Sequence, residues 1–474
     1  MNIFFVGLTG SIGRIPILLS KQLNFSSIHQ IILSDADLHP NCSSYNYYRD
    51  ASLGKFYQEE EYADIAIDAK ILKDLASCES EALKMMDRFQ NTNGLLFYEK
   101  RINLYHKQVR YWLNYLKKNK IDTCVFGTIP HVVHDYIIFS LCKYLGIKTS
   151  MFYRFPILPN RNVSLYSMTD WITQDPEICE KYNFHLKNPE ALKLKKNFLG
   201  YLDLQSGNKG KTFTGIMRSN KGLSKLFKIS NYNKFIKYKI DHWSTTFQRR
   251  SDLKNNLLTR AHPRFFSKKR ISYLQAPNLD EKFIYASLHF QPECSTSPMG
   301  GQYVHQDLMI EALIKNIPAD YKIYIKPHIY GGLAQSLSRR IKFDHRTFLV
   351  APSLNSYEFI KNSSAVATVT GTAGWEAFLN KKPVLMFGEN FYKAAPGVFS
   401  IQSSEDFILS NKKIFDENFK IETDMIHAFL KSMQEISFEG WVDNRYENYS
   451  PLSPEDNANN IAARLLKILN NKEL

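Results

Sequence analysis

The chain has 474 residues and a formal net charge of +15, with 44% hydrophobic and 23% charged residues. This length fits two or three domains, and the composition is that of an ordinary globular protein. No run of about 18 apolar residues predicts a membrane-spanning helix, and the six cysteines form no CxxC pair, so we expect no metal site and a cytoplasmic location.

The first half of the chain alternates apolar runs with amphipathic segments. Short apolar runs predict strands, and apolar residues at helical spacing predict the helices between them. The predicted strands cover residues 2–8, 31–35, 123–127 and 148–153, and the predicted helices cover residues 12–23, 97–119 and 134–146. The tyrosine-rich stretch 41–50 is interpreted as a loop. Strands that alternate with helices favour a parallel, doubly wound sheet.

A strongly basic stretch, residues 205–280, interrupts this alternation. It holds 17 Lys or Arg and 3 Asp, so almost the whole net charge lies there. We interpret it as an inter-domain insertion whose interleaved Lys and apolar residues predict peripheral binding to an anionic membrane surface, at the inner face. A solvated linker and a segment that binds other polyanions stay open as alternatives. Because no known nucleic-acid-binding module is present, we expect no nucleic acid partner.

The alternation resumes at residue 281 and predicts a second α/β unit. Its predicted strands cover residues 282–290, 322–328, 347–352, 365–370 and 383–388, and its predicted helices cover 305–317, 355–362 and 373–381. A closing amphipathic helix is expected over Ser453–Asn471. The expected domains are therefore 1–204, the insertion 205–280, a second domain 281–440 and a C-terminal crossing helix in 441–474.

One stretch of the second unit, "VTGTAGWEAFLNKKPVLMFG" from Val369 to Gly388, has the pattern of a ligand site. A turn between a parallel strand and the next helix lies at the sheet edge where ligands bind, and the helix N-terminus attracts phosphate. If Thr372 caps the helix, Glu376 lies on the same face and is placed to accept hydrogen bonds from sugar hydroxyls. Thr370, Gly371, Thr372 and Glu376 thus predict a nucleotide site. A capped structural turn with a solvent-exposed Glu376 is the alternative.

The same stretch resembles the signature of bacterial capsule-polysaccharide biosynthesis proteins, the group that includes the β-Kdo transferases. "LHFQPECSTSPMGG" (Leu288–Gly301) and "YIKPHI" (Tyr324–Ile329) are similar to further stretches of that family. The resemblance implies a metal-independent GT-B glycosyltransferase, with two Rossmann-like doubly wound domains facing a cleft. It implies that the second domain binds the nucleotide-sugar and that the acceptor approaches from the first.

The resemblance also implies roles for side chains at the strand ends of the second unit. In related transferases a His-Pro pair contacts the donor phosphate, and here His328 stands at that place with Ile329 instead of proline. Lys326 is either structural or a second phosphate contact. In the loop after the first strand of the unit, Glu293 and Ser295 are candidate donor-binding residues, although the loop is also compatible with an ordinary polar connection.

In the first domain, His131 and Asp135 lie between a predicted strand and helix, at the edge where an acceptor would approach. An inverting glycosyl transfer needs a base near the acceptor hydroxyl, and either side chain is a candidate. An Asp that merely stabilises the helix N-terminus is the alternative.

These residues together predict a glycosyltransferase of capsule or surface polysaccharide biosynthesis, acting on a glycan or lipid-linked acceptor. The family resemblance favours a CMP-linked donor that carries Kdo or a related acidic sugar, and no further cofactor is expected. Two other functions stay open: a sugar-nucleotide epimerase of the same fold, and a non-catalytic protein that binds polyanions through the basic stretch.

Overall fold

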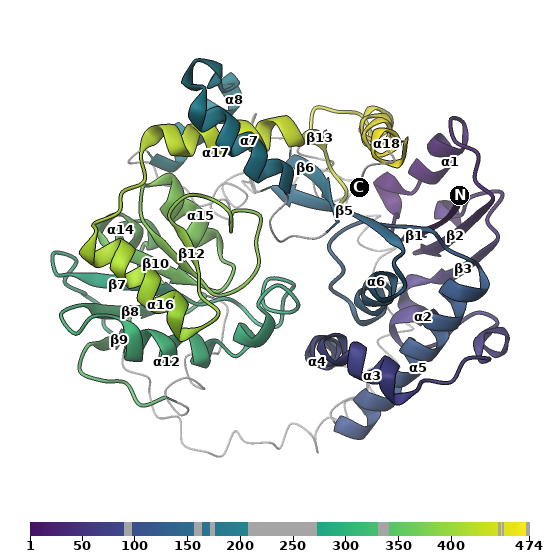
Figure 1. Ribbon diagram of the computed structural model, residues 1–474, viewed down its shortest axis with the longest axis horizontal. Coiled ribbons are helices and arrows are strands. Elements are labelled where there is room, and N and C mark those ends of the chain that lie inside the picture. Colours follow the sequence, from purple (N-terminus) through teal and green to yellow (C-terminus); the bar gives the residue numbers. More distant parts are fainter. Residues whose placement is uncertain are drawn as a thin grey trace, which may run out of the picture. The chain divides into compact units, whose positions relative to one another are not determined.

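Two β-sheets made mainly of parallel strands organise the protein (Figure 1). The computed structural model describes residues 1–89, 97–155, 164–170, 176–206, 273–329, 341–443, 447 and 450–470. Most of the basic stretch 205–280 lies outside these residues, so the boundaries expected at 204, 280 and 440 stay predictions. The predicted pair of Rossmann-like α/β sheets is confirmed. No helix among the described residues is both long enough and apolar enough to cross a membrane.

The first sheet has seven strands in the order β13-β6-β5-β4-β1-β2-β3. Strands β1 to β5 pair in parallel, whereas β6 runs antiparallel to β5, and β13 runs antiparallel to β6. The strand order reverses between β1 and β4, because β2 and β3 follow on one side and β5 and β6 on the other. The strands are β1 (Asn2–Val6), β2 (Ser27–Ile32), β3 (Ser44–Tyr47), β4 (Thr123–Phe126), β5 (Lys148–Phe155), β6 (Ser164–Thr169) and β13 (Phe438–Gly440).

The second sheet has six strands, all parallel, in the order β12-β11-β10-β7-β8-β9. Its order reverses between β7 and β10, so it repeats the doubly wound topology of the first sheet. The strands are β7 (Phe283–Ser287), β8 (Lys322–Lys326), β9 (Thr347–Leu349), β10 (Ala365–Thr368), β11 (Val384–Met386) and β12 (Val398–Ser400).

Helices connect the parallel strands, as crossover connections require. In the first half they are α1 (Ile15–Ser20), α2 (Tyr48–Ser52), α3 (Ala69–Asp74), α4 (Ala76–Met85), α5 (Tyr98–Lys118), α6 (Val133–Leu145), α7 (Pro176–Lys187) and α8 (Lys196–Ser206). In the second half they are α12 (Gln306–Asn316), α14 (Ser356–Asn362), α15 (Thr372–Leu379), α16 (Ser404–Asn411), α17 (Thr423–Ile436) and α18 (Pro454–Asn470).

The predicted loop at residues 41–50 is wrong, because this stretch forms β3 and the start of α2. The strand is polar, but its side chains have partners on α5. The Ser44 hydroxyl lies 2.5 Å from the Tyr115 hydroxyl, and Asn46 Nδ2 donates to the Tyr111 hydroxyl at 3.1 Å. Hydrogen bonds across the layers therefore take the place of the apolar alternation that identifies most strands.

Aromatic side chains fill the cores beside both sheets. On the first sheet, Phe4 of β1 packs on Trp112 and Tyr115 of α5, with ring centroids 5.9 and 5.3 Å apart. On the second, Trp375 of α15 is buried against Phe429 of α17. Burying one such side chain contributes roughly 1.5–3 kcal/mol. The high aromatic content of the chain is thus used largely for packing.

The C-terminal helix α18 lies beside α1 and β13 (Figure 1). Its Ile461 and Leu465 side chains are fully buried, in one core cluster with Phe5 of β1 and Trp441. The chain thus returns to the first sheet after completing the second.

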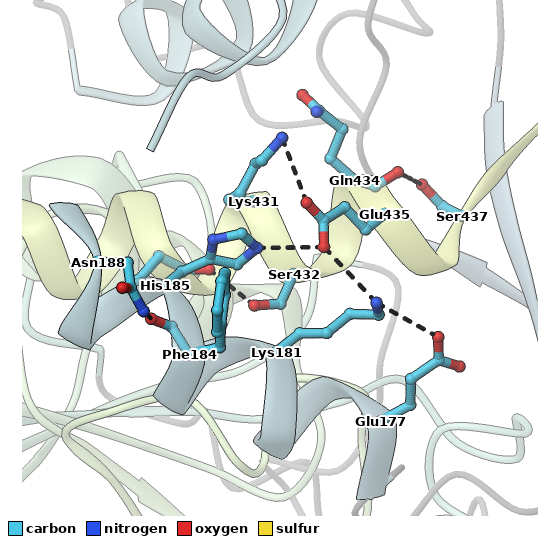
Figure 2. A network of polar contacts seen from close by, with 11 residues as sticks. Glu177, Lys181, Phe184, His185, Asn188, Lys431, Ser432, Gln434, Glu435 and Ser437 are labelled. Atoms are coloured by element: carbon cyan, nitrogen blue, oxygen red, sulfur yellow. Dashed lines mark hydrogen bonds and ion pairs between the residues drawn. The ribbon is translucent and has the colours of Figure 1, made fainter. Parts of the chain in front are cut away.

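A polar network joins α7 to α17 (Figure 2). The Glu435 carboxylate lies 3.1 Å from His185 Nε2, 3.6 Å from Lys181 Nζ and 3.3 Å from Lys431 Nζ. Lys181 also pairs with Glu177 at 3.7 Å. Partly exposed ion pairs each contribute little, so the buried contacts of the two helices dominate the free energy of packing, and the network fixes their orientation.

Candidate functional site

Each sheet has a switch point, where the loops after two neighbouring strands leave in opposite directions. In the first sheet these loops follow β1 and β4, and in the second they follow β7 and β10. Ligands of doubly wound proteins bind outside the carboxyl ends of the strands at this place. All the candidate residues lie at or near one of these two edges.

A cavity of about 590 Å³ lies at the switch point of the first sheet. It is lined by the turn after β1, including Gly7, Thr9 and Gly10, and by the loop after β4, including Gly127. The two loops approach so closely that a Cβ on Gly127 would lie 2.2 Å from the Gly7 carbonyl oxygen. Glycine is therefore required at 127, and the backbones of the two loops form one wall of the cavity.

The structure places both catalytic candidates, His131 and Asp135, in the lining of this cavity. Asp135 is in the first turn of α6, and its Oδ1 atom accepts the Val132 N–H at 2.7 Å. Burial raises the pKa of Asp135 to about 7, although backbone N–H groups and the Arg88 charge oppose the shift. Asp135 thus caps a helix, as the structural alternative expected, and it also presents a carboxyl group that titrates near neutral pH.

His131 adds a neutral imidazole to the same wall. Its Nδ1 atom lies 2.6 Å from the Ile129 carbonyl oxygen, a contact that requires the proton on Nδ1. Burial lowers the pKa of His131 below its usual range, and the Arg88 charge adds to this effect. His131 therefore keeps Nε2 as a hydrogen-bond acceptor, and both side chains have the chemistry of a base.

At the switch point of the second sheet, the turn after β10 differs from the expected one in its cap. The N-cap of α15 is Gly371, and the exposed Thr372 is the first helical residue, so the expectation that Thr372 caps the helix is wrong. The reason is the Thr368 hydroxyl, which accepts the Gly371 N–H at 3.1 Å and ends the strand two residues early. A Cβ on Gly371 would lie 2.6 Å from this hydroxyl, so the turn requires glycine.

Thr370 joins this turn to the loop after β7. Its buried hydroxyl donates to the Ser295 carbonyl oxygen at 2.6 Å, and its own carbonyl accepts Asn390 Nδ2 at 2.6 Å. The Ser295 side chain is partly exposed, and Glu293 is exposed on the same loop. The structure therefore brings Glu293, Ser295 and Thr370 to one edge, with the Thr370 hydroxyl already bonded within the protein.

Glu376 lies in the interior below this turn, with a residue exposure of 4%. The alternative of a solvent-exposed Glu376 is therefore wrong. Burial raises the pKa of Glu376 to about 7, and the positive charge of Lys326 opposes the shift. Burial also raises the pKa of tyrosines near this carboxyl group, with a further contribution from the Glu376 charge: Tyr201, Tyr285, Tyr357 and Tyr392.

Lys326 and His328 follow one another at the end of β8. Lys326 Nζ donates to the Ser356 hydroxyl at 2.9 Å, and burial lowers the pKa of this amine. The ring of His328 is partly exposed and lies 5.8 Å from the ring of Phe290. Lys326 is thus bonded to the N-terminus of α14, and His328 lies at the sheet edge.

The sequence interpretation missed His289, two residues after β7. The Nε2 atom of His289 accepts the Thr370 N–H at 3.1 Å, so its ring connects the two loops of the switch point. The side chain of Gln306 holds the His289 backbone on both sides, through contacts of 2.7 and 3.3 Å. The position of His289 within the quoted motif Leu288–Gly301 was the one available signal in the sequence.

Arg88 is a second residue that the sequence interpretation missed. Its guanidinium group donates to the main-chain carbonyls of both His131 and Ser297. The loop that carries His131 and the loop that carries Ser295 are therefore bonded to the same side chain, although they belong to different sheets.

Comparisons with known proteins identify part of the chain. Residues 231–434 match the family described as "Capsule polysaccharide biosynthesis protein". No curated protein sequence matches the chain.

Among solved structures, the chain is similar to UDP-GlcNAc 2-epimerase from Methanocaldococcus jannaschii, with 12% identity over 92% of this chain and 99% of that one, and a TM-score of 0.25. It is also similar to the β-Kdo 2,7 transferase KpsC of Thermosulfurimonas dismutans, with 12% identity over 82% of this chain and 96% of that one, and a TM-score of 0.31. The epimerase from Neisseria meningitidis bound to UDP-GlcNAc has 13% identity over 99% of both chains and a TM-score of 0.22.

The family match covers every strand of the second sheet and both loops of its switch point. The predicted resemblance is thus confirmed for this part of the chain: residues 231–434 have the sequence of the capsule polysaccharide biosynthesis protein family.

Proposed function

We propose that the protein is a glycosyltransferase of capsule or surface polysaccharide biosynthesis. It transfers a sugar from a nucleotide donor to a glycan or lipid-linked acceptor. The observation that carries this proposal is the coincidence of the family match, residues 231–434, with a switch point that holds His328, Gly371 and Glu376.

The donor nucleotide binds at the second sheet in this proposal. The N-terminus of α15 and the end of β8 supply positive potential for the phosphate, from main-chain N–H groups and from Lys326 and His328. The exposed loop residues Glu293 and Ser295 lie beside the turn and contact the sugar or the nucleoside. Glu376 accepts hydrogen bonds from sugar hydroxyls after a small rearrangement that opens its buried carboxyl group.

The acceptor binds in the cavity of the first sheet, where Asp135 is the base of an inverting transfer. The acceptor hydroxyl attacks the anomeric carbon, a new glycosidic bond forms, and the bond from that carbon to the phosphate oxygen breaks. The hydroxyl proton moves to the Asp135 carboxylate, and the nucleotide leaves with the bonding electrons. A carboxyl group with a pKa near 7 suits this role, because a substantial fraction is ionised at neutral pH and the remaining basicity is high.

The family match, together with the sequence resemblance to β-Kdo transferases, favours a CMP-linked acidic sugar as the donor. Kdo is the sugar proposed. The basic residues at the second switch point, Lys326 and His328, support an anionic ligand of this class without distinguishing CMP from UDP.

The test is a transfer assay with the full chain. The protein is incubated with CMP-Kdo, and separately with UDP-GlcNAc, in the presence and absence of an oligosaccharide acceptor, and the products are identified by mass spectrometry. A longer oligosaccharide that forms only when acceptor is present is the expected result. Conversion of UDP-GlcNAc without an acceptor would instead establish the epimerase, and no turnover under any condition would refute both enzymatic functions.

A further inference from the structure

His289 holds a fixed position at the second switch point. Its Nε2 atom accepts the Thr370 N–H at 3.1 Å and lies 3.2 Å from the Thr368 hydroxyl. Gln306 is fully buried and fixes the His289 backbone through a contact on each side. The ring therefore has two anchors, one on its own strand end and one on the neighbouring loop.

These contacts fix the tautomer of the imidazole. An Nε2 atom that accepts a main-chain N–H carries no proton, so the proton of a neutral ring is on Nδ1. Burial lowers the pKa of His289 to about 4, with a contribution from His328, so the ring is neutral at physiological pH. No acceptor for Nδ1–H exists among the residues that the structure describes, and Nδ1 is not enclosed by protein.

Other donors at this edge are already used within the protein. The Thr370 N–H is bonded to His289, the Thr370 hydroxyl to Ser295, and the Gly371 N–H to Thr368. Lys326 Nζ is bonded to Ser356. The Nδ1–H group of His289 therefore differs from these four donors, because it has no acceptor in the described part of the protein.

We infer that His289 is a ligand-binding residue that donates Nδ1–H to an anionic phosphate oxygen of the donor nucleotide. The inference rests on the proposed function, which places the nucleotide at this switch point. The role is distinct from that of a cationic phosphate ligand, because the ring contributes a directed hydrogen bond without a positive charge. The Thr370 amide orients this donor, so the turn after β10 acts on the ligand through the His289 ring.

Two substitutions separate the two nitrogen atoms of the ring. In His289→Gln, the side-chain oxygen replaces Nε2 as the acceptor for the Thr370 N–H, and no donor remains at the position of Nδ1. In His289→Asn, the side-chain nitrogen replaces Nδ1–H, and the acceptor for Thr370 is lost. His345→Gln is the matched control, because His345 is exposed and lies before β9, at the opposite edge of the sheet.

Thermal unfolding and calorimetric titration with CMP and with UDP provide the readouts. We expect His289→Gln to unfold near the wild-type temperature and to bind the nucleotide roughly 10-fold or more weakly, as for loss of a hydrogen bond to a charged group. His289→Asn should unfold at a lower temperature yet retain more of the affinity. If His289→Gln binds the nucleotide within twofold of the wild type, the inference is overturned while the proposed function stands. If the wild type binds neither nucleotide, the proposed function fails, and the inference fails with it.

The tautomer has a test of its own that needs no nucleotide. Histidine labelled with ¹⁵N gives nitrogen chemical shifts that distinguish the two neutral tautomers and the imidazolium, and His289→Gln assigns the signal. We expect the Nδ1–H tautomer at pH 7. An Nε2–H tautomer or an imidazolium would overturn the inference.

Discussion

The Oδ1 atom of Asp135 accepts the main-chain N–H of Val132 at 2.7 Å, inside the wall of the cavity at the first switch point. This single hydrogen bond satisfies one carboxyl oxygen only in part, and burial raises the pKa of the group to about 7. Asp135 thus has both a structural contact and the protonation behaviour of a base.

We expect Asp135→Asn to lower the transfer rate by about 100-fold or more, the usual contribution of a general base. The same variant should affect stability in a pH-dependent way. Because the pKa of Asp135 is higher in the folded than in the unfolded protein, its carboxyl group destabilises the fold increasingly as the pH rises from about 4 to about 7. The variant should therefore gain unfolding temperature relative to the wild type more at pH 8 than at pH 5.

Thermal unfolding of both proteins at the two pH values measures this difference. The comparison cancels the titration of Glu376, which is present in both proteins. An equal difference at pH 5 and pH 8 would contradict the raised pKa, and an unchanged transfer rate would exclude Asp135 as the base.

Glu376→Gln tests the contact between the buried carboxylate and a sugar hydroxyl. We expect the affinity for the nucleotide donor to fall roughly 10–150-fold, since a hydrogen bond to a charged group contributes about 1.5–3 kcal/mol. Calorimetry at pH 8, where Glu376 is mostly ionised, measures the affinity. Glu405→Gln is a suitable control, because Glu405 is exposed at the start of α16. Equal affinities of wild type and Glu376→Gln would remove Glu376 from the site.

His328→Ala should weaken nucleotide binding roughly tenfold or more, because it removes a polar contact at the end of β8. Its neighbour Ile329 is 56% exposed, so Ile329→Ala changes the same strand end without removing a polar group. Calorimetric titration of both variants with the same nucleotide decides the matter. Similar losses in the two variants would point to a disturbed strand end rather than a lost ligand contact.

A thermal-shift panel of CMP, UDP and GDP tests the identity of the nucleotide. A ligand present at 100 times its dissociation constant adds about 2.7 kcal/mol to the free energy of unfolding, and for a chain of this size we expect a rise of several degrees. We expect CMP to give the largest rise. A rise with UDP or GDP and none with CMP would contradict the proposed CMP-linked donor.

The basic stretch 205–280 predicts salt-sensitive binding to anionic membranes. Each Lys or Arg near such a surface contributes about 1 kcal/mol, and screening over roughly 8 Å at physiological salt weakens the attraction. Vesicle sedimentation at low salt should pellet the wild type with anionic vesicles. A variant with five lysines changed to Gln should stay in solution: Lys225, Lys228, Lys234, Lys237 and Lys239. A wild type that ignores anionic vesicles at low salt would refute the membrane role.

The sequence by itself determined the two α/β units and the sheet edges that carry the candidate residues. Apolar runs and their spacing are local properties, and the carboxyl ends of parallel strands must meet at one edge, so His131, Asp135, His328 and Gly371 were found without coordinates. The family resemblance was equally local, because it depended on the short stretches that surround the second switch point.

Only the tertiary structure decided which of these side chains are buried, bonded or available. The pKa values near 7 for Asp135 and Glu376 arise from burial by segments far away in the chain, which no local pattern encodes. His289 and Arg88 were missed for the same reason. Their partners, Thr370 for one and both His131 and Ser297 for the other, become neighbours only when strands and helices distant in sequence pack together.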